Sequence, residues 1–247
     1  MFKYVILGII QGLTEFLPVS SSGHLVIAQR LFGFTGEEIA VSIVLHLGTL
    51  VAVIIFFFKD IIIALRDLKL AAFILITTFI TGAIGLSGKN FFESLFSSPR
   101  VSIAMLFITG VILLLTSRIS INARKEIKLK DAVILGFTQA IAIIPGISRT
   151  GVTISTLLFR GLNKEICFKL SFLVSIPLIL GASFLELKEL NSAVQTNMVN
   201  ILTGFTSSVV SGLLALLILK LVIKRAKFYY FGYYCIIAAL LALIFVK

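Results

Sequence analysis

Charged residues are scarce in this sequence, and their scarcity limits what the protein can be. Of its 247 residues, only 13% are Asp, Glu, Lys or Arg, whereas 59% are hydrophobic, and the mean hydropathy is +1.13. A soluble domain has about a quarter charged and about half apolar residues. The composition therefore excludes a sizeable soluble domain and predicts one all-α, polytopic membrane domain over residues 1–247.

Acidic residues and cysteines are scarce as well. The 22 Lys and Arg residues outnumber the 11 Asp and Glu residues. This excess is typical of basic cytoplasmic loops in a membrane protein, and we expect no nucleic acid partner. The two cysteines, Cys167 and Cys235, have no spacing that indicates a disulfide or a metal site, so we interpret them as packing residues.

Long apolar stretches account for most of the chain. Six of them approach the ~20 residues that a helix needs to cross the hydrocarbon core. They cover residues 41–58, 70–87, 100–117, 167–185, 199–219 and 229–246. Two further apolar regions, 5–30 and 132–159, are interrupted by "PVSSSG" and "PGISRTG". Proline and glycine end a helix, and free backbone groups inside a membrane must be buried or face a wet cavity, so we predict two re-entrant helical hairpins.

The order of these segments predicts an inverted-topology repeat. Each half is one hairpin plus three transmembrane helices, with repeat 1 at about 1–120 and repeat 2 at about 129–247. Because three is odd, the second half starts on the opposite side of the membrane. One constant shift along the chain, without a gap, pairs Gly8 with Gly136, Gln11 with Gln139, Ser20 with Ser148 and Gly23 with Gly151. Lys and Arg concentrate in alternate loops, which places the first hairpin on the outer side.

The first hairpin carries polar groups that a purely structural segment does not need. Gln11 and Glu15 are four residues apart and share one helix face. Ser20, Ser21 and Ser22 supply hydroxyls at the start of the next half-helix, where the N-terminus favours anions such as phosphate. His24 follows about one turn into that half-helix. In this kind of fold the site forms where the hairpins meet, near the midplane.

The second hairpin repeats the design with a positive charge. In "PGISRT", Ser148 and Thr150 supply hydroxyls, and Arg149 supplies a guanidinium that can hold two phosphate oxygens. An ionisable residue inside a membrane is a functional-site candidate because burying it is costly. Together the two hairpins offer an acid, an imidazole, hydroxyls and a guanidinium, which suits phosphoryl transfer.

Simpler interpretations of the same residues stay open. Glu15 and Arg149 could do no more than pair with each other across the hairpins. The serines could serve only as helix caps, and His24 could be a hydrogen-bonded core histidine. For His46, within the span 41–58, we expect packing or support of the site rather than catalysis.

Four segments carry a resemblance to a known family. "GIIQGLTEFLPVSSSGHL" and "PGISRTGVTIS" resemble the two signature segments of the undecaprenyl-diphosphate phosphatase family, also called bacitracin-resistance proteins. "VLHLGTLVAV" and "SFLVSIPLILGA" are also similar to that family, and the resemblance covers essentially the whole chain. It implies hydrolysis of undecaprenyl diphosphate to undecaprenyl phosphate and inorganic phosphate. It further implies recycling of the lipid carrier for cell-wall synthesis, resistance to bacitracin, and a site on the outer side of the bacterial cytoplasmic membrane.

The resemblance also implies roles for individual residues. Ser21 is the expected nucleophile, His24 the acid or base that serves it, and Glu15 a group that assists proton transfer or holds a divalent cation, Mg²⁺ or Ca²⁺. Arg149 is expected to clamp the diphosphate. The residues expected to bind substrate beside it are Gln11, Ser20, Ser22, Gln139, Ser148 and Thr150. Some family members have Glu where this chain has Gln11, which weakens any mechanism that needs two carboxylates.

Two questions stay open from the sequence. The attacking group is either Ser21, through a covalent phosphoserine, or a water oriented by Glu15 and His24. The function is either that of a hydrolase or that of a polyprenyl-phosphate transporter or flippase, because inverted repeats with broken helices are common among transporters. The expected partners are the lipid substrate and the bilayer, and the extended apolar faces allow a homodimer.

Overall fold

The protein is helical throughout the described part of the chain. The structure is a computed structural model that describes residues 1–34, 38–96, 98–119, 124–185 and 198–245. Within these ranges, β pairing is limited to an isolated bridge between Arg124 and Leu162. The predicted all-α class is therefore confirmed. The ends of the two predicted repeats, residues 120 and 247, and the last residue of the predicted span 229–246 lie outside the described residues.

Both interrupted apolar regions form a pair of short helices. The pairs are α1 (Phe2–Phe16) with α2 (Ser21–Leu31), and α8 (Leu129–Ile141) with α9 (Arg149–Phe159). Helix α1 ends because Leu17, with φ −69° and ψ 143°, precedes Pro18, whose ring disfavours helical backbone in the residue before it. Between α8 and α9 the chain turns at Gly146, whose φ of +94° costs glycine little. The breaks therefore lie where the sequence predicts them.

All six predicted spans are helical. They form α3 (Glu38–Phe56), α5 (Leu68–Ser87), α7 (Pro99–Leu115), α10 (Lys164–Leu185), α12 (Met198–Lys224) and α13 (Tyr230–Phe245). Shorter elements connect them: α4 (Phe58–Arg66), α6 (Lys89–Phe96) and the 3₁₀ turn η1 (Thr116–Arg118). In the described ranges, four helices are long and apolar enough to cross a membrane, namely α5, α7 with η1, α10 and α12. A fifth candidate is α3 together with α4, bent by 74°, and α13 is a shorter apolar helix. These lengths and compositions indicate a multi-pass membrane protein.

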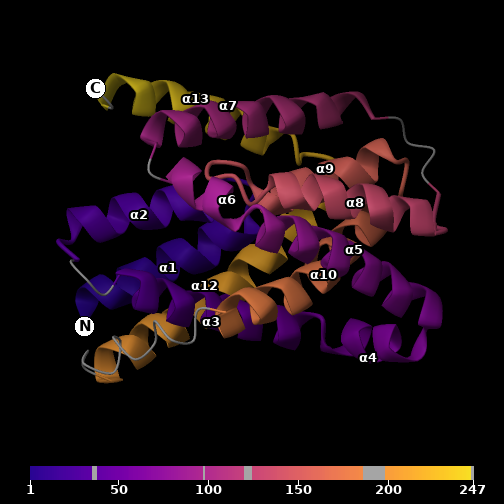
Figure 1. Cartoon of the computed structure of the whole chain (residues 1–247), viewed down its shortest axis with the longest axis horizontal. Coiled ribbons are helices and arrows are strands. Elements are labelled where there is room, and N and C mark those ends of the chain that lie inside the picture. Colours follow the sequence, from indigo (N-terminus) through magenta and orange to yellow (C-terminus); the bar gives the residue numbers. More distant parts are fainter. Residues whose placement is uncertain (35–37, 97, 120–123, 186–197, 246–247) are drawn as a thin grey trace.

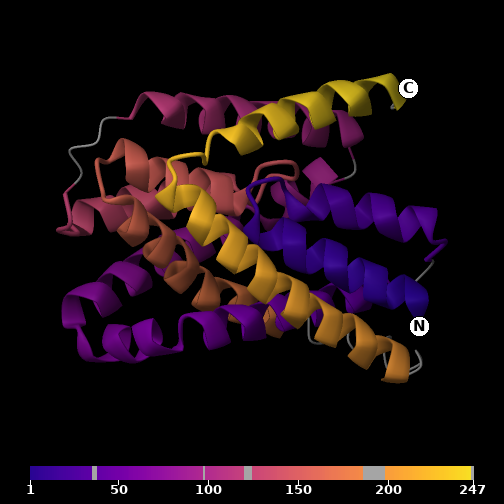
Figure 2. The ribbon, with the colours of Figure 1, turned by 180° about the vertical axis from the view of Figure 1, so that it is seen from behind.

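The helices of the two short pairs lie against long helices from the other half of the sequence. Helix α1 runs along α12, and α8 packs on α5. Helices α7 and α13 lie side by side along one edge of the molecule in both views (Figures 1 and 2). Small residues allow the α1–α12 approach, since a Cβ on Gly12 would lie 2.6 Å from the backbone nitrogen of Gly212 and 2.6 Å from the carbonyl oxygen of Ser208.

Hydroxyl groups reinforce these close helix contacts. Ser211 of α12 donates a hydrogen bond to the carbonyl oxygen of Gly8 at 3.1 Å. On the other side, Thr81 of α5 donates to the carbonyl oxygen of Gly136 at 2.9 Å. Such bonds hold helices together where apolar burial distinguishes little between protein and lipid. The two short helix pairs are thus anchored in the same way, each through its first helix.

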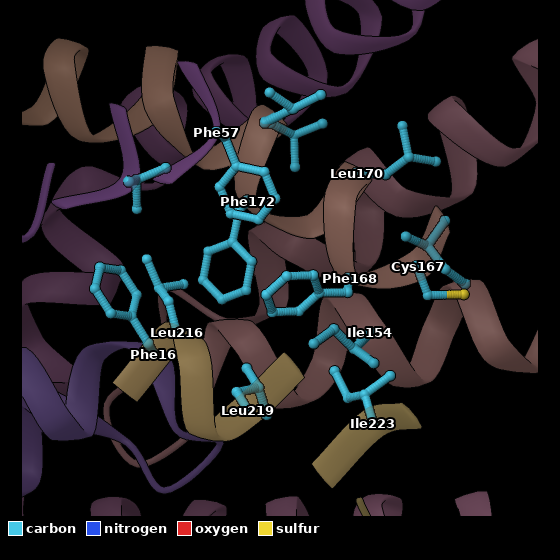
Figure 3. Close-up of a cluster of buried hydrophobic side chains, with 14 of the residues drawn as sticks. Phe16, Phe57, Ile154, Cys167, Phe168, Leu170, Phe172, Leu216, Leu219 and Ile223 are labelled. Carbon is cyan, nitrogen blue, oxygen red and sulfur yellow. The ribbon is translucent and has the colours of Figure 1, made fainter. Parts of the chain in front are cut away.

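A cluster of aromatic and aliphatic side chains packs against the end of α1, in the first helix pair. Figure 3 shows Phe16 at the end of α1 facing Phe172 of α10, with a ring-centre distance of 5.5 Å and an edge-to-face geometry. Phe57 and Phe168 continue the cluster, and Phe57 stacks on Phe172 at 5.6 Å. Edge-to-face and offset-stacked rings are the favoured geometries. The rigid packing fixes the last turn of α1, which carries Glu15.

The open ends of both short pairs are tied by a polar contact. In the first pair, the Nζ atom of Lys3 donates to the carbonyl oxygen of Phe32 at 2.6 Å. In the second pair, Nε of Arg160 donates to Oδ1 of Asp131 at 3.0 Å. The shift that pairs Gly8 with Gly136 also pairs position 3 with position 131, and position 32 with position 160. The start of the first helix is therefore linked to the end of the second helix in both pairs.

Asp131 is the most enclosed charge at these helix ends, outside the spanning helices. Its side chain is fully buried, and Oδ2 accepts hydrogen bonds from Nη2 of Arg124 at 2.6 Å and from the backbone N–H of Lys128 at 3.1 Å. Burial alone would raise the pKa of Asp131, but the hydrogen bonds from Arg124, Arg160 and Lys128 hold this pKa below its ordinary value. The carboxylate therefore stays charged and joins the loop before α8 to the end of α9.

Candidate active site

The carboxylate of Glu15 lies at the centre of the site. It belongs to the last turn of α1, and 8% of its side chain is exposed. Oε1 accepts a hydrogen bond from Nη2 of Arg149 at 2.5 Å, and Oε2 accepts one from the hydroxyl of Ser21 at 2.7 Å. Nε2 of Gln11, one turn earlier on the same face, donates to Oε2 at 3.3 Å. The buried charge is stable here because opposite charge and hydrogen-bond donors surround it.

Arg149 brings the second helix pair to the first. It is the first residue of α9, and its partner Glu15 is 134 residues earlier in the chain. The interpretation that these two charges pair with each other is confirmed. The pair does not use the whole guanidinium, however, because Nη1 is buried without a hydrogen-bond partner among the described residues. This nitrogen retains donor capacity for an anion.

The three serines form the start of α2. Ser20 precedes the helix with a φ of +66°, which is uncommon for a residue other than glycine, and its hydroxyl lies 3.4 Å from that of Ser22. Ser21 is the first helical residue and turns its hydroxyl to Glu15. The Ser20 side chain makes no capping hydrogen bond. The first N–H groups of α2 are therefore not satisfied by this side chain, and such groups favour an anion.

The polar residues of the second pair have different partners. Ser148 caps α9, since its Oγ accepts a hydrogen bond from the backbone N–H of Gly151 at 3.1 Å, which confirms the capping interpretation for this serine. Thr150 donates to the carbonyl oxygen of Glu15 at 3.2 Å and so ties α9 to the end of α1. Gln139 donates to the hydroxyl of Thr81 on α5 at 3.2 Å rather than to Glu15.

His24 faces α13, and its present partners do not include Ser21. Its Nδ1 lies 2.8 Å from the carbonyl oxygen of Ser20 and must carry a proton to bind there. In the neutral ring, Nε2 then accepts a hydrogen bond from the Tyr234 hydroxyl, at 2.7 Å. The two rings are stacked with their centres 6.0 Å apart. Sequence reasoning missed Tyr234, whose only signal is the tyrosine-rich start of the last span.

His46, for which the sequence predicts packing or support of the site, lies beside Glu15. Its Nε2 lies 3.7 Å from Oε2 of Glu15, the oxygen that also accepts the Ser21 hydroxyl. Its Nδ1 lies 2.8 Å from the carbonyl oxygen of Ser42, one turn earlier on α3. The side chain is 35% exposed. An ionisable residue within an apolar span was the available sequence signal.

The donor set of the site does not suit a metal ion held by the protein alone. In the described residues, no group of three or more His, Cys, Asp and Glu side chains lies close enough to hold one. Glu15 is the one carboxylate among the described groups around it, and both its oxygens already accept hydrogen bonds. A cation bound there would also face the positive charge of Arg149. The residues therefore do not fit a resident divalent cation.

Comparison with known proteins gives one consistent result. The family model described as "Bacitracin resistance protein BacA" matches residues 4–241. A protein named undecaprenyl-diphosphatase from Halothermothrix orenii is 41% identical, over 99% of this chain and 97% of its own length. Proteins with the same name from Desulforapulum autotrophicum and Methanococcus maripaludis are each 39% identical, over 98% or more of both chains. The two short helix pairs that meet at Glu15 and Arg149 therefore belong to a member of the bacitracin resistance protein BacA family.

Proposed function

We propose that this protein is an undecaprenyl-diphosphatase, which hydrolyses undecaprenyl diphosphate to undecaprenyl phosphate and inorganic phosphate. The family and the names of the relatives support this activity. The observation that carries it is the hydrogen bond from the Ser21 hydroxyl to the Glu15 carboxylate, at 2.7 Å. A serine hydroxyl that is hydrogen-bonded to a buried carboxylate has a base in place to take its proton, and this activates its oxygen as a nucleophile. The proposed role is recycling of the lipid carrier for cell-wall synthesis, and with it resistance to bacitracin.

The proposed first step is attack by Ser21 on the terminal phosphorus. The bond from this phosphorus to the bridging oxygen breaks, and undecaprenyl phosphate leaves. The Ser21 proton passes to Oε2 of Glu15, which is already its hydrogen-bond acceptor. Removal of the proton as the new bond forms is general base catalysis. Direct attack by water at the same carboxylate is the alternative, and retention of turnover by Ser21→Ala would favour it.

The anion is held by donors that the protein leaves unused. Nη1 of Arg149 is buried without a partner in the described part of the chain and points to a phosphate oxygen in this proposal. The N–H groups at the start of α2 supply further donors. Gln11, Ser22, Ser148 and Thr150 line or brace this region in the proposal. His24 acts on the substrate rather than on Ser21, exchanging the Tyr234 hydroxyl for a phosphate oxygen.

In this proposal Gln139 stabilises the free protein and also binds the substrate. Its Nε2 binds Thr81 of α5, so in the free protein it stabilises the second pair. Its Oε1 is buried without a partner among the described residues, as is Oε1 of Gln11. An unpaired buried acceptor is costly. In our proposal both glutamines bind the substrate, each through a water molecule or a protonated phosphate oxygen.

The expected divalent cation, Mg²⁺ or Ca²⁺, enters the site on the substrate in our proposal. Mg²⁺ commonly binds substrate phosphates and retains several waters, with few protein ligands. Such a cation needs no preformed cage, which agrees with the donor set around Glu15. Equilibrium dialysis of the lipid-free protein against Mg²⁺ tests this proposal, and stoichiometric binding without lipid would contradict it.

The membrane arrangement that we propose is an inverted repeat in the bacterial cytoplasmic membrane. The two short pairs are re-entrant hairpins, and the site opens to the outer side. Contacts at equivalent positions of the two repeats, Lys3 with Phe32 and Asp131 with Arg160, support this arrangement. A polyprenyl tail stays in the bilayer, so a site between broken helices reaches the headgroup from the membrane side. The exposed apolar helix faces also suit a homodimer.

Phosphate release is the first experiment. Detergent-purified protein is incubated with undecaprenyl diphosphate, with Glu15→Gln, Ser21→Ala and Arg149→Ala in parallel. Turnover by the parent and its loss in all three folded variants is the expected result. A folded parent that binds the lipid but releases no phosphate, with or without divalent cation, would refute the proposed hydrolase and leave a carrier of the same anion.

A further inference from the structure

His46 has a reactive nitrogen beside the carboxylate oxygen that accepts the Ser21 proton. The carbonyl oxygen of Ser42, 2.8 Å from Nδ1, can only accept a hydrogen bond, so Nδ1 carries the proton. In the neutral ring Nε2 is then a bare acceptor, and it lies 3.7 Å from Oε2 of Glu15. Two acceptors at this distance repel each other unless a proton or a water molecule joins them. The geometry suits a water bound to both atoms.

Exposure and neighbouring groups agree with a water at this position. The His46 side chain is 35% exposed and that of Glu15 is 8% exposed, so the imidazole is the more accessible of the two groups. The groups that face Oε2 are the Ser21 hydroxyl, the Gln11 amide and this imidazole. The other carboxylate oxygen of Glu15, Oε1, accepts a hydrogen bond from Arg149. A water between His46 and Oε2 therefore lies next to the Ser21 oxygen.

The other histidine cannot serve this position without moving. Both nitrogens of His24 have partners elsewhere, at the Ser20 carbonyl and the Tyr234 hydroxyl. Among the groups that contact Oε2 in the described structure, His46 is the one imidazole, and a neutral imidazole has a lone pair at Nε2 that can take a proton. A phosphoserine at Ser21 needs such a base, because Glu15 has just accepted the serine proton.

We propose that His46 is a further catalytic residue, which deprotonates the water that hydrolyses phosphorylated Ser21. The inference rests on the proposed hydrolase function and assigns its second step. The water oxygen bonds to phosphorus as the bond from phosphorus to Oγ of Ser21 breaks. One water proton moves to Nε2 of His46, and Oγ regains its proton from the Glu15 carboxylic acid. Inorganic phosphate leaves, and the imidazolium returns its proton to solvent.

Two substitutions separate this role from the structural contacts of His46. His46→Asn keeps a donor near the Ser42 carbonyl, and His46→Gln keeps a polar atom near Oε2, but neither supplies a base. Loss of a general base lowers turnover by about 10²–10⁴-fold. Because the first step does not need His46, each variant should release undecaprenyl phosphate once, in a stoichiometric burst, and then stall as phosphoserine. His24→Gln is the comparison variant: it removes an imidazole that binds substrate in our proposal and does not contact Glu15, so it should slow the first step without accumulating phosphoserine.

The experiment mixes each purified variant with undecaprenyl diphosphate and follows two signals. Lipid products are quantified on a rapid time course, and intact-protein mass spectrometry with peptide mapping detects phosphate on Ser21. Phosphoserine accumulation in both His46 variants and not in His24→Gln is the expected result. Parental turnover in the His46 variants, slow turnover without phosphoserine, or equal accumulation in His24→Gln would each overturn the inference. If the parent itself releases no phosphate, the proposed function fails instead, and the two failures are thus distinct.

Discussion

The ion pair between Glu15 and Arg149 should be more costly to break from one side than from the other. Glu15→Gln leaves a guanidinium that is 18% exposed without its carboxylate, and removal of one partner of a buried pair costs about 3–5 kcal/mol. Arg149→Gln leaves a carboxylate that still accepts hydrogen bonds from Ser21 and Gln11. For this second change we expect about half the cost of the first, because these two donors still compensate the carboxylate.

The two cysteines provide the assay. Cys167 and Cys235 are fully buried and free, so a fluorogenic maleimide reacts with them as the protein unfolds. In a protein of this size, 1 kcal/mol changes the midpoint of thermal unfolding by about 2–4 °C. We therefore expect Glu15→Gln to lower the midpoint by about 10 °C, and Arg149→Gln to lower it by about half as much.

The double variant tests the pairing itself. With both charges removed, no stranded charge remains, so the double variant should lose less than the sum of the single losses. Residues in contact typically show coupling energies of about 0.5–3 kcal/mol. Strictly additive losses, or a larger loss for Arg149→Gln than for Glu15→Gln, would refute the reasoning. A Tyr233→Phe variant, changed near neither charge, controls for preparation and detergent.

Three further predictions test other contacts. Tyr234→Phe removes a hydrogen bond worth about 0.5–1.5 kcal/mol, which His24 gives up on binding substrate in our proposal, so it should lower KM by up to about tenfold and leave kcat unchanged, whereas Tyr233→Phe should retain the parental values of both. Gly12→Ala should lower the unfolding midpoint, because its Cβ would lie 2.6 Å from backbone atoms of α12, whereas Gly82→Ala, with no atom within 4 Å, should not. The lowered pKa of Asp131 stabilises the fold at pH values above the ordinary value of 3.8 for this group, and this contribution is lost as the pH falls through the lower, folded value. Asp131→Asn should therefore be less stable than the parent at neutral pH, and the difference in their unfolding midpoints should shrink on acidification below about pH 4.

Much of the fold could be predicted because proline, glycine and long apolar stretches act locally. The predicted span 70–87 is helix Leu68–Ser87, and both interruptions lie at "PVSSSG" and "PGISRTG". The 74° bend between α3 and α4 was not predicted. The chain there, "IIFFFKDIII", is a nearly continuous apolar run without proline or glycine. The bend lies at Phe57, whose ring packs against the rings of both Phe168 and Phe172, so tertiary packing rather than a local signal accompanies it.

The site residues could be predicted from the sequence only where polar groups interrupt an apolar segment. Glu15, Ser21 and Arg149 stand out because charge and hydroxyls interrupt apolar sequence, and the structure brings them together. Tyr234 does not stand out, because a tyrosine near the end of a span is ordinary and its partner His24 is 210 residues away. The position of His46 beside Glu15 likewise depends on how α3 packs against α1, which no local pattern encodes.

The two halves of the sequence contribute different kinds of reactive side chain to the site, although their hairpin segments are similar. The shift that aligns the two predicted repeats matches Ser20 with Ser148 and Ser22 with Thr150, so both halves have hydroxyls at a helix start. The same shift matches Glu15, Ser21 and His24 with Ile143, Arg149 and Val152. The first half therefore supplies the groups that can move protons, and the second half supplies a fixed positive charge at the position that corresponds to Ser21. In the folded chain the two helix starts meet, and Arg149 binds Glu15, the hydrogen-bond acceptor of its counterpart Ser21. In our proposal, two helix starts of similar sequence thus form one site, in which the first start reacts and the second holds the charge in place.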